Sequence, residues 1–128
     1  MARIKVTKYK GCSNKDIAKA ILSLSNNIIK ACGGDETLVR LVLSIAVAAW
    51  NISLYPEKEN DYSQKVMEKI PESLPLEYKE LLKTFFLKFI DEKQKRFPGF
   101  KKGITSYKLK FENSMPQLVV HALPVKPE

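Results

Sequence analysis

The spacing of apolar residues divides the chain into four helical segments followed by a pair of strands. Apolar residues recur every three or four positions in residues 13–32 and again in residues 76–96, which predicts two amphipathic helices. Residues 38–54 are apolar almost all round, and a helix of this kind lies in the middle of its domain or in an oligomer interface. After a polar connection over residues 57–61, a short helix is predicted to run to Ile70, before Pro71.

The predicted helix ends follow from capping chemistry. Ser13 is a suitable N-cap for the first helix, and Asp16 lies near its positive end. The pair Gly33-Gly34 ends that helix, and Asp35 caps the next one. Proline supplies the remaining signals: the dipeptide Tyr55-Pro56 ends the apolar helix, Pro75 suits the first turn of the fourth helix, and Phe97-Pro98-Gly99-Phe100 marks its stop.

Near the C-terminus the period changes from helical to alternating. Tyr107, Leu109 and Phe111 alternate with polar residues, a turn follows over residues 113–116, and residues 118–123 form the returning strand. Residues 2–9 also alternate, which fits either a short strand joined to this hairpin or a charged tail. The predicted fold class is α+β, mainly helical with about four helices and a C-terminal antiparallel β-hairpin. Residues 1–128 are expected to form a single domain.

The distribution of charge along the chain is the one feature of the sequence that points to a function. The 128 residues carry a net charge of +8 with a pI near 9.5. The excess lies at the two ends, because residues 1–32 hold seven basic residues and one acid, and residues 97–128 hold five and two. Basic side chains on strands suit phosphate contacts with nucleic acid or another polyanion. The residues predicted to make these contacts are Arg3, Lys5, Lys8, Lys10, Lys108 and Lys110.

Two other interpretations of the same residues stay open. Lysines on strand faces also prevent edge-to-edge aggregation and keep a protein soluble. Apolar residues within 38–54 or 85–97 could then lie in a homodimer interface, so that the chain is a homo-oligomeric protein-interaction module without catalytic activity.

Catalytic and metal-binding patterns are weak, so we expect a binding protein rather than an enzyme, with no cofactor and no metal. Gly33-Gly34-Asp35-Glu36 copies the start of the diguanylate cyclase signature but lacks that family's surrounding elements. Cys12 and Cys32 lie at opposite ends of one predicted helix, too far apart for a disulfide. His121, the single histidine, is expected to pair across the hairpin.

The expected cellular location follows from two kinds of segment that the sequence lacks, a membrane span and a signal peptide. The longest apolar run, residues 41–54, is shorter than the roughly 20 residues that span a bilayer, so we expect no membrane insertion. No apolar stretch of signal-peptide length follows the N-terminal residues, and the two cysteines are not arranged as a CxxC pair. A cytoplasmic protein with reduced thiols is the expectation.

The segment Ala49-Trp50-Asn51-Ile52-Ser53-Leu54-Tyr55-Pro56 resembles a segment found in a group of small uncharacterised bacterial proteins. In that group an Ala-Trp-Asn-x-x-Leu-x-Pro segment precedes a long helix that ends in Phe-Pro, and a closing pair of strands then begins near a tyrosine. Phe97-Pro98 and Tyr107 stand in the matching places. The resemblance implies this order of elements and no activity, substrate or catalytic residue.

Overall fold

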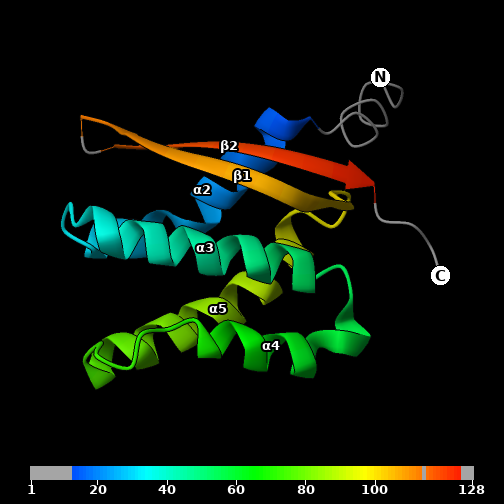
Figure 1. The fold of residues 1–128 in the computed structure, drawn as a ribbon. Helices are drawn as coiled ribbons and strands as arrows, with labels where there is room; N and C mark the ends of the chain where they lie inside the picture. Colours follow the sequence, from blue (N-terminus) through cyan, green and yellow to red (C-terminus); the bar gives the residue numbers. More distant parts are fainter. Residues whose placement is uncertain (1–12, 114, 125–128) are drawn as a thin grey trace.

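The computed structural model describes residues 13–113 and 115–124, in which the hairpin, the α2–α3 pair and the α4–α5 pair are stacked as three layers (Figure 1). The elements, in chain order, are α2 (Asn14–Ala31), α3 (Glu36–Ile52), a short 3-10 turn η1 (Pro56–Lys58), α4 (Glu59–Glu68), α5 (Leu76–Arg96), β1 (Lys102–Glu112) and β2 (Met115–Pro124). The predicted α+β class, mainly helical with a C-terminal antiparallel hairpin, is confirmed. The alternating residues 2–9 lie outside the described residues.

Helix α3 is the centre of the packing. It contacts α2, α4, α5 and strand β1, while β2 rests on α2, so the hairpin covers one side of the α2–α3 pair and α4 and α5 lie on the other (Figure 1). Trp50, Leu43 and Ala46 on α3 are completely buried. The almost uniformly apolar composition of this helix is explained by these neighbours, which surround it within one chain. None of the helices described here is long and apolar enough to cross a membrane.

The predicted caps of α2 and α3 are present. The Ser13 hydroxyl accepts a hydrogen bond from the Asp16 backbone N–H at 3.1 Å, and the Asp16 carboxylate accepts one from the Ser13 N–H at 3.1 Å, which is a complete capping box. Gly33 and Gly34 have φ angles of 60° and 85°. These left-handed conformations favour glycine and turn the chain sharply into α3, whose N-cap is Asp35.

Four predicted boundaries were wrong by one to a few residues, and one of them is the end of α4, which lies at Glu68 rather than at Ile70. The polar residues 57–61 are not a loop, because η1 covers the first two of them and α4 begins at Glu59. Helix α3 ends at Ile52, before the Tyr55-Pro56 pair expected to end it, and its C-cap Ser53 donates a hydrogen bond to the Trp50 carbonyl. Pro75 is the N-cap of α5 rather than a residue of its first turn.

The hairpin is longer than the alternating pattern indicated. Strand β1 begins at Lys102 and pairs with β2 along its whole length, from Lys102 opposite Pro124 to Glu112 opposite Met115. A bulge lies between Ile104 and Ser106, so the inward-facing positions change parity there. Ile104 is buried before the bulge, whereas Leu109 and Phe111 are the inward positions after it.

The start of β1 is held by a buried cluster around Trp50. The Trp50 indole N–H donates a hydrogen bond to the Lys102 carbonyl at 2.9 Å. The ammonium of Lys93, a residue only 3% exposed, lies 4.8 Å from the centre of the Trp50 ring and donates to the Phe100 carbonyl at 2.7 Å. Helix α5, the turn after it and strand β1 are thereby fixed to the end of α3.

Candidate nucleic-acid interface

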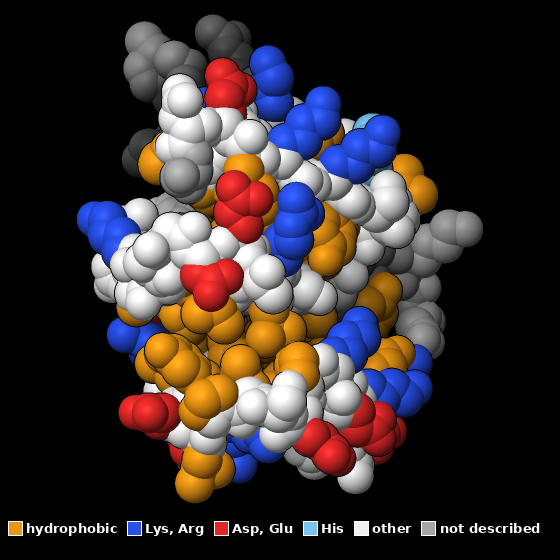
Figure 2. Space-filling model, turned by 60° about the vertical axis from the view of Figure 1, so that its left-hand side comes forward, with side chains coloured by type: hydrophobic (Ala, Val, Ile, Leu, Met, Phe, Trp, Pro, Cys, Tyr) orange, Lys and Arg blue, Asp and Glu red, His pale blue; other side chains and the backbone are white. Residues whose placement is uncertain are grey.

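The outward face of the hairpin carries the basic residues that the sequence singled out. Its cross-strand pairs are Ser106 with His121, Lys108 with Val119, Lys110 with Gln117, and Glu112 with Met115. All of these side chains are exposed, because the helices cover only the opposite face. Figure 2 shows Lys and Arg side chains gathered in the upper part of the molecule, close to the single histidine.

Lys108 and Lys110 are arranged as two parallel donors. Residues two apart on a strand point to the same face and are separated by roughly 7 Å along it. Their cross-strand partners, Val119 and Gln117, carry no negative charge, and the one acid on this face, Glu112, stands at the hairpin tip. Each ammonium group can therefore donate to an incoming anion without first breaking an ion pair.

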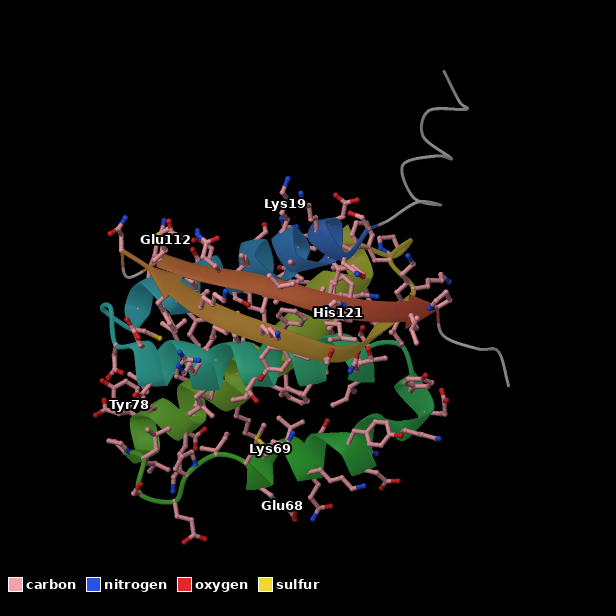
Figure 3. All side chains as sticks on the ribbon, turned by 45° about the horizontal axis from the view of Figure 1, so that its top comes forward. Lys19, Glu68, Lys69, Tyr78, Glu112 and His121 are labelled. Atoms are coloured by element: carbon pink, nitrogen blue, oxygen red, sulfur yellow. The ribbon has the colours of Figure 1, made fainter. Side chains whose placement is uncertain are left out.

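Helix α2 extends the basic surface beyond β2. The Asn14 side-chain oxygen accepts a hydrogen bond from the Ala122 N–H at 3.2 Å, so the first turn of α2 is anchored to the outer edge of β2. Lys15 and Lys19 follow at the spacing of one helical turn and are both exposed. Figure 3 shows Lys19 on α2, on the far side of β2 from β1, and His121 on β2.

Another cation lies beside the first strand. The guanidinium carbon of Arg40, on α3, is 4.9 Å from the centre of the Phe111 ring. Arg40 is exposed, and Phe111 is half-buried on the inward face of β1. The ring holds the guanidinium next to the hairpin, so positive charge borders β1 as well as β2.

The structure brings together only part of the predicted site. Lys108 and Lys110 share one exposed face as predicted, while Arg3, Lys5, Lys8 and Lys10 lie outside the described residues. Sequence reasoning missed Lys15, Lys19 and Arg40 as neighbours of the hairpin. The basic bias of residues 1–32 was a signal for the two lysines, whereas nothing in the sequence connects Arg40 with Phe111.

One hollow and two titratable groups lie outside this basic face. A surface hollow of about 300 Å³ is lined by Asp16, Lys19, Ala20, Ser23, Phe97 and Phe100. The carboxylate in this hollow belongs to Asp16, which is part of the N-terminal cap of α2. Hydrogen bonds from the Ser13 backbone and hydroxyl lower the pKa of Asp16. Burial, and secondarily the charge of Asp35, raises the pKa of the Cys32 thiol, which disfavours the reactive thiolate. Within residues 13–113 and 115–124 no three His, Cys, Asp or Glu side chains cluster as metal ligands would.

Comparisons with protein-family models, with curated proteins and with solved structures each found no match for this chain. The resemblance to small uncharacterised bacterial proteins therefore stays a prediction.

Proposed function

We propose that this protein is a nucleic-acid-binding module that contacts phosphates through the outward face of its β-hairpin. The observation that carries the proposal is the pair Lys108 and Lys110, side by side on an exposed strand and opposite uncharged partners. Lys15 and Lys19 on α2 supply further cations next to the same sheet. Phosphate contacts of this kind position a protein on nucleic acid and give most of the non-specific affinity.

The chemistry of the face favours a duplex over a single strand. A two-stranded β-ribbon fits the major groove of DNA, and Gln117, opposite Lys110, carries the amide that can recognise adenine. Single-strand binders instead stack bases on aromatic rings. The described positions on the face of Lys108 and Lys110 hold no Phe, Tyr or Trp: Phe111 faces the helices, and Tyr107, although 36% exposed, pairs with the buried Val120 on the other face.

As part of the same proposal, the chain works in the cytoplasm and acts by binding. Nucleic acid is present in the cytoplasm, and the thiols would stay reduced there.

The homo-oligomeric alternative, in which the positive charge serves solubility, differs from the nucleic-acid proposal in one measurable respect. It predicts no salt-sensitive binding to nucleic acid.

The test is fluorescence anisotropy of labelled duplex DNA, duplex RNA and single-stranded DNA, titrated with the full chain at two salt concentrations. We expect duplex binding that weakens steeply with salt, and a double reversal Lys108→Glu with Lys110→Glu that lowers affinity and reduces the salt slope by about two.

A matched control carries the same change in net charge on another face. Lys69, next to α4, and Lys83, on α5, are both exposed, and Figure 3 shows Lys69 on the side away from the hairpin. The double variant Lys69→Glu with Lys83→Glu should retain most of the affinity. Equal losses in the two double variants, or no binding at low salt, would overturn the proposal.

A further inference from the structure

A band of apolar side chains is exposed where α5 passes the turn between α2 and α3. Tyr78 and Leu81 on α5 are 41% and 44% exposed, and they border a hollow that Ala31, Cys32 and Leu38 line from the other two helices. Figure 2 shows hydrophobic side chains forming a continuous band across the middle of this face, below the basic region. Contiguous exposed apolar surface of this kind marks an interaction site.

The residues that flank the band on α5 form a self-complementary stripe. Glu77, Leu81, Thr84 and Lys88 are spaced by four, three and four residues, so they lie along one side of the helix, and all four are exposed. This spacing of four, three and four residues is the same whether it is counted from the N-terminal or the C-terminal end of α5. A two-fold axis between Leu81 and Thr84 therefore places Leu81 of each copy opposite Thr84 of the other, and Glu77 opposite Lys88.

The charges at the two ends of the stripe are available for such an exchange. The ion pair on α5 joins Lys95 to Asp91, and it leaves Glu77 and Lys88 uninvolved. Residues one turn inward from these two are Leu81 and Thr84, which offer no opposite charge on the same stripe. Across a two-fold axis each carboxylate would instead meet the lysine of the second copy.

We propose that the exposed side of α5 is a homodimer interface, in which α5 packs antiparallel against α5 of a second copy around Leu81 and Thr84. Leu81 supplies the apolar contact beside the hollow, and two symmetric Glu77–Lys88 pairs set the direction and register. Burial of the apolar band drives association, while the charge pairs reject other registers. This inference does not depend on nucleic-acid binding, because the interface residues are separate from the hairpin lysines.

The first test compares two leucines of α5 that differ in position and not in chemistry. Leu87 is 51% exposed but lies about 120° round the helix from Leu81. Molar mass is measured by analytical ultracentrifugation of the full chain over a range of concentrations. We expect the wild type and Leu87→Glu to dimerise and Leu81→Glu to stay monomeric, with circular dichroism confirming that both variants are folded.

The second test uses charge reversal at positions whose exposure makes misfolding improbable. Glu77→Lys places like charges at both symmetric contacts, and so does Lys88→Glu, so each single variant should weaken dimerisation by about tenfold or more. The double variant Glu77→Lys with Lys88→Glu restores opposite charges and should recover most of the wild-type affinity.

Three other results would contradict this homodimer. A wild-type chain that remains monomeric at every concentration would overturn the homodimer. Loss of the dimer in Leu87→Glu with retention in Leu81→Glu would place the interface on another side of α5. Failure of the double charge reversal to recover affinity would rule out the antiparallel Glu77–Lys88 register.

Discussion

Asn51 forms two hydrogen bonds with the backbone of Ile104, one through each end of its side-chain amide. The Asn51 oxygen accepts from the Ile104 N–H at 2.7 Å, and the Asn51 nitrogen donates to the Ile104 carbonyl at 3.0 Å. A helix side chain thus satisfies the outer edge of β1, where a neighbouring strand would otherwise pair. Because Trp50 bonds to Lys102 two residues earlier, consecutive residues of α3 fix where the hairpin begins.

Replacing Asn51 by alanine should destabilise the fold. Asn51→Ala leaves the partly buried N–H and carbonyl of Ile104 without this partner, which costs about 2–3 kcal/mol after a small gain in helix propensity. Urea denaturation followed by the fluorescence of Trp50, the single tryptophan, measures the change. Asn26→Ala, at an exposed position of α2, gains the same propensity and should leave stability unchanged or slightly higher. Equal effects at the two positions would contradict a structural role for the Asn51 pair.

Stability at low pH should depend on Asp16. Its folded pKa lies below the ordinary value of 3.8, chiefly because the Ser13 N–H bonds to the carboxylate. Its contribution is therefore fully present above that value and is lost as the pH falls through the lowered pKa. Asp16→Asn keeps an acceptor and removes the charge. The variant should be less stable than the wild type at neutral pH by a few tenths of a kcal/mol, small because the group is exposed.

The discriminating measurement is the difference between wild type and Asp16→Asn across the pH range. Urea midpoints taken at neutral pH and in acid should converge, since both side chains are uncharged once Asp16 is protonated. A difference that stays constant with pH would show that the charge of Asp16 does not act through the α2 cap.

Ser25 offers a stabilising substitution. Its hydroxyl is completely buried in α2, and it has no hydrogen-bond partner among the described residues. Removing the hydroxyl removes an unsatisfied polar group and improves helix propensity, so Ser25→Ala should raise the free energy of unfolding by about 1 kcal/mol. The control variant is Ser23→Ala, on the exposed side of α2. It gains the same helix propensity but loses a surface hydrogen bond from Arg96. A destabilised Ser25→Ala would indicate that the hydroxyl is satisfied in solution.

Local chemistry explains why the sequence predicted some boundaries and missed others. The Ser13–Asp16 box and the Gly33-Gly34 pair act within a few residues, so they can be read directly. Helix α4 begins at Glu59 after Lys58, which makes no side-chain cap, and of its described side chains Val66 is the fully buried one. No local capping signal marks the start of that helix, so a polar stretch of sequence does not reveal it.

Within strand β1, one half could be predicted from the sequence and the other half could not. Alternation from Tyr107 to Phe111 gave the outer half of the hairpin and placed Lys108 and Lys110 on its exposed face. The bulge after Ile104 shifts the parity of inward positions, so the period-two pattern stops there although the strand continues back to Lys102.

The element order, the caps of α2 and α3 and the outward face of the hairpin could be predicted from the sequence, because each depends on the spacing of neighbouring residues. Which surfaces come together depends on how the helices and strands pack. Arg40 reaches Phe111, and Asn14 brings Lys15 and Lys19 to β2, through contacts between residues far apart in the chain. On α5, Leu82 is buried and Leu81 exposed because the other helices cover one side of it. Such pairings arise from chain topology, which no local pattern encodes.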